Sequence, residues 1–153
     1  MKESALPPML VELLNGRDLG DKQQEAFQLL TISSDEWPHT SMVSVGEVVA
    51  LDQERLRISL WPGTRTTSNI LRTGKAKLVI SKDGIVYYVR MMLAQLPELQ
   101  GVRYRRERFE ARVVAVRADK ASYAEVVSGF KIKLHEPGDV VERWGETVSD
   151  LLK

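Results

Sequence analysis

Apolar and polar residues alternate in several short segments of the first half of the chain, a pattern typical of strands with one buried face. Residues 26–33 (AFQLLTIS) and the valine-rich residues 40–51 are two predicted strands, and Gly46 is expected to form a bulge in the second. Residues 55–61 (RLRISLW) alternate most regularly. Leu56, Ile58 and Leu60 face one way, while the other face carries Arg57, Ser59 and Trp61.

The second half begins with the strongest hairpin pattern in the chain, KAKLVISKDGIVYYVRMMLA at 75–94. Asp83 and Gly84 stand between its two apolar halves, and this pair suits a tight turn in which both central residues have positive φ. Residues 109–118 (FEARVVAVRA) predict a further strand. The strands are therefore expected to pair with their neighbours in antiparallel fashion.

Two helices are predicted before the hairpin. Pro7 and Pro8 can open the first, at about 7–15, and Gly16 can end it. The second is short, begins in the polar residues 64–69 and ends at Gly74.

Two more helices are predicted after the last strand. Asp119 can cap one that runs to about residue 128 and stops at Gly129. The other starts near Asp139, where Glu142 sits three residues on in a capping-box arrangement. Antiparallel strands with peripheral helices predict a mainly β fold, a small β-barrel. We expect a single domain over 1–153, with the N-terminal helix at about 7–15, the barrel at about 26–118 and the C-terminal helices at about 119–152.

Composition excludes several classes of protein. The 153 residues carry a net charge of +1, so no general attraction to nucleic acid or to an anionic membrane is expected. The chain contains no cysteine, which excludes disulfides and thiol catalysis. No signal peptide is recognisable at the start, and no apolar run approaches the roughly 20 residues that a membrane span needs. These features favour a cytoplasmic protein.

Side-chain motifs for catalysis or metal binding are scarce. His39 and His135 lie far apart, without HxH or HExxH spacing, so no metal site is predicted. No serine stands in a GxSxG elbow, and no catalytic residue can be named. The basic run RYRRER at 103–108 contains Tyr104 and could form a strip for nucleic acid. The simpler interpretation is a solvated loop that leads into the strand at 109–118.

The polar cluster at 64–69 is the remaining candidate site. The start of a helix exposes N–H groups that favour an anion, and Arg65 adds a planar, always-charged fork that suits phosphate oxygens. The alternative is simple capping of the helix by Thr64, which explains one residue of the cluster and leaves the others unassigned.

The wider context resembles a known family. The stretch PHTSMVSV, the valine-rich strand that follows and RISLWPGTRTTSNILRTGKAKLVI resemble the pyridoxamine 5′-phosphate oxidase-like family, the FMN-binding split barrels. The resemblance extends from about residue 26 to 118. By position, Thr64 takes the place of the family's serine, Arg65 of its arginine and Thr66 of its lysine, and Thr73-Gly74 stands where Asn-Pro ends the family's helix. Thr66 thereby removes a charge from the expected phosphate site.

The resemblance implies that the cofactor is FMN and that two segments lie along it. The cofactor-binding residues that it implies are Ser41, Met42, Val43, Ser44, Ser59, Leu60, Trp61, Thr64, Arg65, Thr66 and Thr67. In such proteins the flavin carries out the redox chemistry, and the protein supplies binding and orientation. This agrees with a sequence in which no acid–base pair stands out.

The first hypothesis is therefore a homodimeric, FMN-binding oxidoreductase that acts on a small molecule, without a nucleic-acid or membrane partner. The dimer is expected because the hairpin carries more apolar surface than a small barrel can bury. The residues that supply this surface are Tyr87, Tyr88, Met91, Met92 and Leu93. Two alternatives stay open. One is a ligand- or haem-binding member of the same fold without flavin chemistry, and the other is a nucleic-acid-binding β-barrel that uses residues 103–108.

Overall fold

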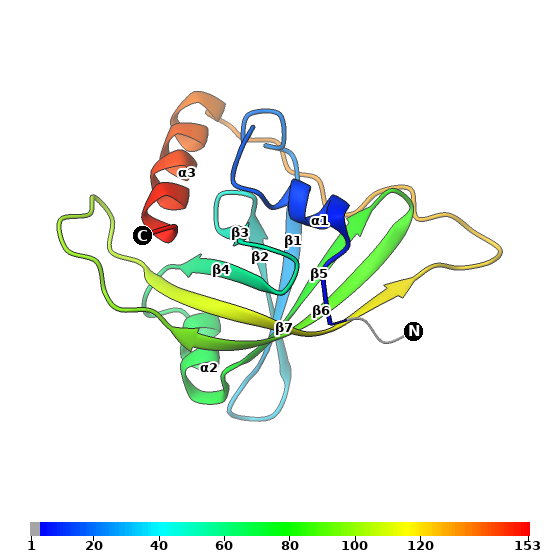
Figure 1. Ribbon diagram of the computed structural model, residues 1–153, viewed down its shortest axis with the longest axis horizontal. Helices are drawn as coiled ribbons and strands as arrows, with labels where there is room; N and C mark the ends of the chain where they lie inside the picture. The colour runs from blue at the N-terminus through cyan, green and yellow to red at the C-terminus, as the bar shows by residue number, and fades with distance from the viewer. Residues whose placement is uncertain (1–3) are drawn as a thin grey trace.

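The centre of the molecule is one curled antiparallel sheet of seven strands (Figure 1). The computed structural model describes residues 4–153. Along the chain the elements are α1 (Pro8–Leu13), β1 (Ala26–Ile32), β2 (Pro38–Ser44), β3 (Val48–Ala50), β4 (Arg55–Leu60), α2 (Arg65–Thr73), β5 (Lys75–Lys82), β6 (Ile85–Gln95), β7 (Glu107–Asp119) and α3 (Pro137–Leu151). The strand order is β2-β1-β5-β6-β7-β4-β3, so both edge strands, β2 and β3, meet at one short turn. The predicted mainly β, barrel-like fold is confirmed.

The strand predictions with the most regular patterns agree best with the structure. On β4, Leu56 and Ile58 are fully buried, while Arg57 projects from the opposite face. The predicted hairpin is formed by β5 and β6, and Asp83 and Gly84 have φ values of 52° and 83°, as a tight primed turn requires.

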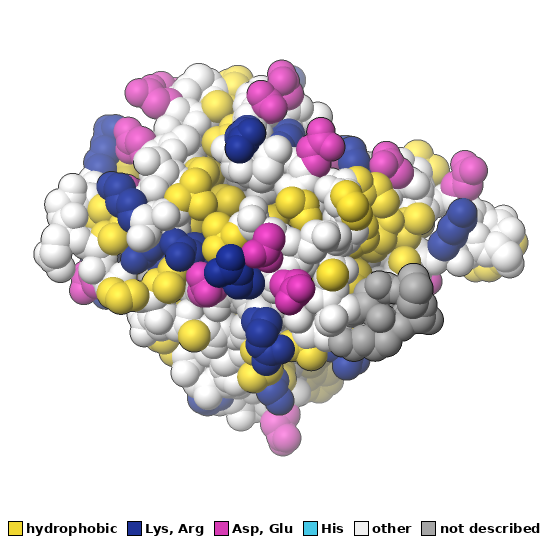
Figure 2. All heavy atoms as spheres, in the orientation of Figure 1, with side chains coloured by type: hydrophobic (Ala, Val, Ile, Leu, Met, Phe, Trp, Pro, Cys, Tyr) yellow, Lys and Arg dark blue, Asp and Glu magenta, His cyan; other side chains and the backbone are white. Residues whose placement is uncertain are grey.

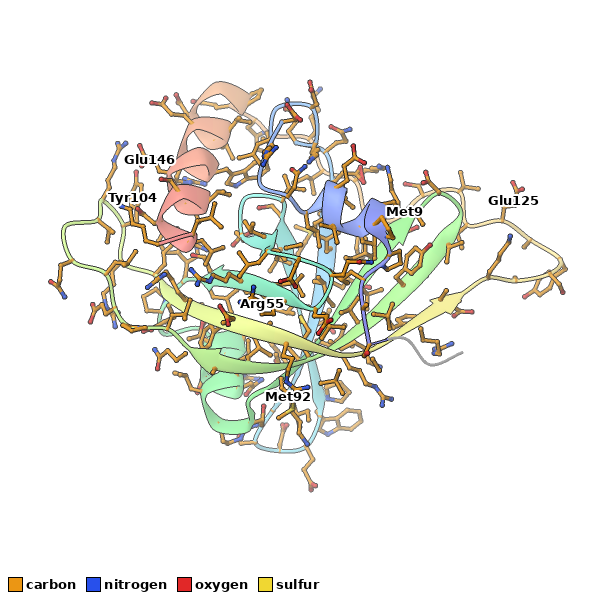
Figure 3. All side chains as sticks on the ribbon, viewed as in Figure 1. Met9, Arg55, Met92, Tyr104, Glu125 and Glu146 are labelled. Carbon is orange, nitrogen blue, oxygen red and sulfur yellow. The ribbon has the colours of Figure 1, made fainter. Side chains whose placement is uncertain are left out.

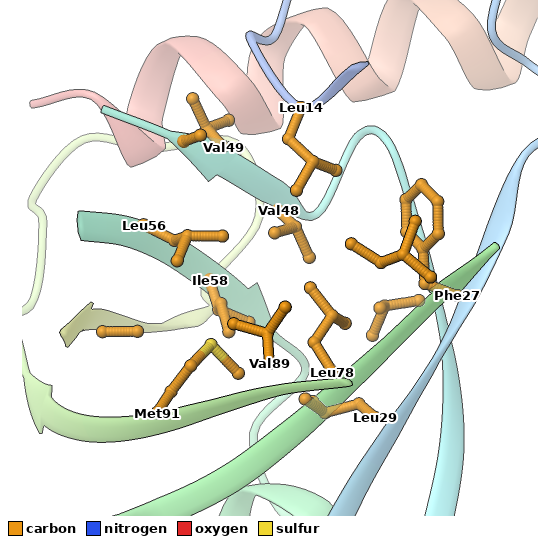
Figure 4. Packing of buried hydrophobic residues seen from close by; sticks show 14 of the residues in the cluster. Leu14, Phe27, Leu29, Val48, Val49, Leu56, Ile58, Leu78, Val89 and Met91 are labelled. Carbon is orange, nitrogen blue, oxygen red and sulfur yellow. The ribbon is translucent and has the colours of Figure 1, made fainter. Parts of the chain in front are cut away.

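The apolar core fills the inside of the curled sheet (Figure 4). Leu29, Ile58, Leu78 and Val89 each have no exposed surface and come from four different strands. Leu10 and Leu14, in α1 and directly after it, close one side of this cluster. Burial of apolar surface on this scale is the main stabilising contribution to such a fold.

The helices lie outside the sheet, with α1 and α3 at one end of the molecule in Figure 1 and α2 at the other. Gly74 ends α2 in the left-handed conformation, with φ 66°, as its position predicted. In the part of the chain that the structure describes, no helix combines the length and the apolar character needed to cross a bilayer.

The helix predicted from Asp119 to about 128 is wrong. Residues 120–136, all of them described, form no helix, and Asp119 is the last residue of β7. Its carboxylate accepts a hydrogen bond from the Tyr88 hydroxyl (2.9 Å) instead of capping a helix. Tyr123 and Val127 are 91% and 96% exposed, so a helix here would have no partner on which to bury its apolar side chains. A helix this short is marginal without such packing.

Two boundaries also need correction. Gly46 lies in a turn that divides the predicted strand 40–51 into β2 and β3, rather than in a bulge. A Cβ at Gly46 would stand 2.1 Å from Trp144 Cγ, so the close approach of α3 is what requires glycine. The last helix starts at Pro137, and its N-cap, Glu136, makes no side-chain capping bond, so the predicted capping box at Asp139 is absent.

Candidate functional site

The first turn of α2 uses part of the polar cluster to cap itself. Thr64 is the N-cap, and its hydroxyl oxygen accepts a hydrogen bond from the backbone N–H of Thr67 (3.1 Å). The Thr67 hydroxyl donates to the carbonyl of Trp61 (2.8 Å). Capping therefore explains both Thr64 and Thr67, one residue more than the sequence suggested.

Two further members of the cluster face inward. Thr66 is 4% exposed and Asn69 is 3% exposed. The Asn69 amide donates to the Thr31 hydroxyl (3.0 Å), which fastens α2 to β1. Thr66 stands where the family has its phosphate lysine, and its side chain lies on the buried side of the helix. The assignment of Thr66 as a phosphate ligand stays a prediction, and its placement gives it no support.

Arg65 and Ser68 are the members of the cluster that remain exposed without a partner. Neither side chain makes a hydrogen bond or ion pair with a described residue. The first turn of α2 contains no acidic residue, although the positive end of a helix dipole favours negative charge there. An arginine in the first turn is unfavourable for the same reason, unless an anion binds beside it.

A surface depression of about 520 Å³ lies beside Arg65, between α2 and the turn that joins β1 to β2. Ser33, Ser34 and Asp35 form one wall, and Arg65, Ser68 and Arg72 form the other. Arg72 donates to the Ile32 carbonyl and to Asn69 Oδ1 (3.2 Å), and no described carboxylate pairs with it. Two guanidinium groups against the single carboxylate of Asp35 make this depression suited to an anion.

A partly buried hydrogen-bond network joins the other two predicted segments, 41–44 and 59–61. The Glu47 carboxylate accepts from the N–H and the hydroxyl of Ser44, both at 3.0 Å. Its second oxygen pairs with Arg106 (3.1 Å), whose Nε donates to the Ser59 hydroxyl (2.7 Å). The network therefore holds the end of β2 against the end of β4.

Arg106 also orders the aromatic side chains beside this network. Its guanidinium lies 4.2 Å from the ring centre of Trp61, and the Tyr104 ring meets Trp61 edge-on at 6.2 Å. Burial lowers the pKa of Arg106, and the neighbouring Glu47 carboxylate partly offsets that effect. Trp61 remains 43% exposed, so part of its surface is accessible to a ligand.

The predicted cofactor residues fall on two faces of the barrel. Met42, Ser44, Ser59 and Trp61 lie on the strand faces opposite the core. Met42 is 58% exposed, whereas Ser44 and Ser59, which bond to Glu47 and Arg106, are only 6% and 2% exposed. Val43 and Leu60 are core residues, so only their backbone atoms face outward. Ser41 lies on the same strand face as Val43, and its hydroxyl is buried without a partner among the described residues. The structure thus brings Ser44, Ser59 and Trp61 together and places Thr64 and Arg65 at a separate depression.

The arginines of the basic run at 103–108 have partners within the protein, although the Arg103 and Arg105 side chains are 68% and 58% exposed. Arg103 pairs with Glu146, and Arg105 pairs with Glu98 and Glu107. Arg108 is 7% exposed and donates to the Pro97 carbonyl (2.7 Å). Tyr104 and Glu146 lie close together at the outer end of this loop (Figure 3).

The surface charge agrees with this internal pairing. On the face shown in Figure 2, basic and acidic side chains are interspersed, as a net charge of +1 suggests. The structural role of Arg106 and Arg108 was missed in the sequence. The signal that could have indicated this role is their separation by two residues at the start of β7, which places both side chains on one face.

The apolar group expected at a subunit interface divides between core and surface. Tyr87 and Met91 are 4% and 2% exposed and belong to the core. Met92 is 39% exposed and, with Ile32, borders an apolar groove of about 600 Å³ on the outer face of the sheet. Figure 3 shows Met92 projecting away from the barrel.

Comparison with known proteins gives one relative and several similar structures. No family model matches the chain. The uncharacterized protein YclD of Bacillus subtilis (strain 168) is 46% identical over 151 residues, which cover 99% of this chain and 98% of YclD.

Three solved structures are similar in fold. A Lactobacillus delbrueckii protein named as a candidate pyridoxamine 5′-phosphate oxidase is 16% identical, with a TM-score of 0.59, and covers 76% of this chain and 98% of its own. HupZ of Group A Streptococcus is 11% identical, with a TM-score of 0.57, and the match covers 84% of this chain and 99% of HupZ. The styrene monooxygenase flavin reductase SMOB of Pseudomonas putida S12 is 14% identical, with a TM-score of 0.50, and the match covers 65% of this chain and 81% of SMOB.

Proposed function

The chain belongs to the same family as YclD and has the split-barrel fold of pyridoxamine 5′-phosphate oxidase-like proteins, and from this premise we propose that it binds FMN and is an oxidoreductase for a small molecule. One observation carries the proposal. Two arginines without a carboxylate partner among the described residues, Arg65 in the first turn of α2 and Arg72 in its last turn, border a depression along this helix. The resembled family holds the flavin phosphate at the start of the corresponding helix.

The charges at this depression support a phosphate group in particular. Arg65 lies at the positive end of α2, and its guanidinium offers a fork of N–H groups that suits phosphate oxygens. Both terminal nitrogens of Arg72 already donate to the protein, so Arg72 contributes mainly its charge. Ser33, Ser34 and Ser68 add three hydroxyl donors. The family's phosphate lysine is absent, because Thr66 stands at its position. Arg72 would supply the second positive charge instead.

The outer face of the barrel would hold the flavin ring. Met42 offers exposed apolar surface, and Ser44 and Ser59 are fixed beside each other through Glu47 and Arg106. Part of the Trp61 surface is exposed beside them. A bound flavin supplies electron or hydride transfer, and these residues would bind and orient it. No side chain here is assigned to proton transfer.

We further propose a homodimer that covers the apolar groove beside Met92. Ile32 and Met92 are 44% and 39% exposed, and large exposed apolar patches usually mark an interface. A two-fold dimer is the commonest closed assembly. Sedimentation at micromolar concentration should show a particle of twice 17.3 kDa. A particle of 17.3 kDa would contradict the dimer.

The absorbance spectrum of freshly purified protein tests the function most simply. A flavin band, or a flavin spectrum that shifts when FMN is added to colourless protein, is the expected result. A haem Soret band would favour the ligand-binding alternative. A colourless protein that shows no change on addition of FMN would overturn the proposal.

A further inference from the structure

A second depression, of about 460 Å³, lies between β2 and α3 and shares no lining residue with the depression beside Arg65. Its apolar lining comes from three elements: Met42 on β2, Leu134 in the segment before α3, and Val140 and Trp144 on α3. This volume is within the range of small-molecule sites, which are typically about 300–1,000 Å³ and mostly apolar. The depression therefore offers a mostly apolar surface, to which exposed Met42 contributes.

The charges at its rim are unbalanced. The Arg143, Lys133 and His135 side chains line the depression and make no hydrogen bond or ion pair with a described residue. Of the two carboxylates in the lining, Glu47 is already occupied by Ser44 and Arg106. Lys133 and Arg143 therefore face only Glu136 as an unpaired negative charge, which leaves an excess of one positive charge.

The surroundings of Arg143 strengthen this imbalance. Arg143 lies close enough to Arg106 for its charge to lower the pKa of that guanidinium. Among the described residues, Glu47 is the one carboxylate that pairs with Arg106, and it forms no ion pair with Arg143. An anion that bound to Arg143 would relieve the repulsion between them.

We propose that this depression binds a small molecule with a flat apolar body and one carboxylate, with the carboxylate at Arg143 and the body against Met42, Val140 and Trp144. Its role as the substrate site rests on the proposed function, because Met42 and Ser44 also belong to the flavin-facing strand β2. Binding itself requires only the residues of this chain that line the depression.

The test compares 2-naphthoate with neutral 2-naphthamide, titrated calorimetrically into flavin-free protein. The wild type should bind 2-naphthoate about 10-fold more tightly than 2-naphthamide, the effect of one partly exposed charged hydrogen bond. Arg143→Gln should abolish this preference and leave 2-naphthamide unchanged. Met42→Glu, which puts a negative charge into the apolar lining, should weaken 2-naphthoate more than 10-fold.

Arg17→Gln is the matched control, because Arg17 is an exposed arginine that does not line the depression. It should leave both affinities unchanged. Equal affinities for the two probes in the wild type, or equal losses in Arg143→Gln and Arg17→Gln, would overturn the proposal. Binding of 2-naphthoate by protein that takes up no FMN would support this site and contradict the flavin function alone. Loss of FMN affinity in Arg143→Gln would instead assign the depression to the flavin and overturn its role as the substrate site.

Discussion

Replacing Glu47 with glutamine tests the partly buried network that joins β2 to β4. The substitution keeps the size of the side chain and removes its charge. The Arg106 side chain is only 9% exposed and the Glu47 side chain 21%, so the guanidinium would lose its one carboxylate partner in a largely dry environment. Breaking a fully buried pair typically costs about 3–5 kcal/mol, and charged hydrogen bonds are worth about 1.5–3 kcal/mol. Because Glu47 keeps some contact with water, we expect Glu47→Gln to destabilise the fold by about 2–3 kcal/mol.

Urea unfolding followed by tryptophan fluorescence measures this change. Glu98→Gln is the control, since Glu98 pairs with Arg105 at a site where both side chains are more than half exposed. Such a surface pair contributes about 0–1 kcal/mol. Combining Glu47→Gln with Arg106→Met should cost less than the sum of the two single changes, because neither charge is then left alone. If Glu47→Gln and Glu98→Gln have the same small effect, the network does not hold the two strands.

Three other substitutions give sharp expectations. Gly46→Ala should destabilise the protein by about 1–3 kcal/mol in urea unfolding, because its Cβ would stand 2.1 Å from Trp144 Cγ. Gly145→Ala is the control, since Gly145 lies in open space on α3, and it should stabilise the protein by up to about 1 kcal/mol. Equal effects of the two substitutions would contradict the close packing at Gly46. Asn69→Leu should lower the free energy of unfolding by about 1–3 kcal/mol, since it leaves the buried Thr31 hydroxyl without its hydrogen-bond donor. An unchanged free energy of unfolding would show that α2 is held by apolar contacts alone. Bound FMN should quench Trp61 fluorescence, and Trp61→Phe should remove most of the quenching over the background of Trp37 and Trp144; undiminished quenching would place the ring elsewhere.

Local patterns were sufficient for most of the sheet. The alternation at 55–61 and the Asp83-Gly84 turn depend on neighbours in sequence, and the structure follows them closely. The helix prediction at 119–128 was wrong because a cap residue and a stop residue indicate only where a helix can begin and end. They do not indicate whether the helix has a surface to pack against. Gly46 was misplaced for a similar reason, since its role depends on Trp144, about a hundred residues away in the chain.

The candidate site shows the same limit. Arg65 could be proposed from its place at the start of a helix, which is a local property. The position of Arg72 beside Ser33 and Ser34 could not be predicted, because it depends on how α2 lies on β1. The pairing of Glu47 with Arg106 spans 59 residues and left no pattern in the sequence.

The central claim is that the depression beside Arg65 and Arg72 binds the phosphate of FMN. Fluorescence titration of the wild type, Arg65→Ala and Arg72→Ala with FMN and with riboflavin, which lacks the phosphate, tests it directly. Loss of a hydrogen bond to a charged group, about 1.5–3 kcal/mol, predicts that Arg65→Ala binds FMN roughly 10- to 100-fold more weakly than the wild type, with riboflavin affinity unchanged. Arg72→Ala should act in the same direction. Equal affinities of the wild type and Arg65→Ala for FMN, or equal losses for FMN and riboflavin, would contradict the phosphate site.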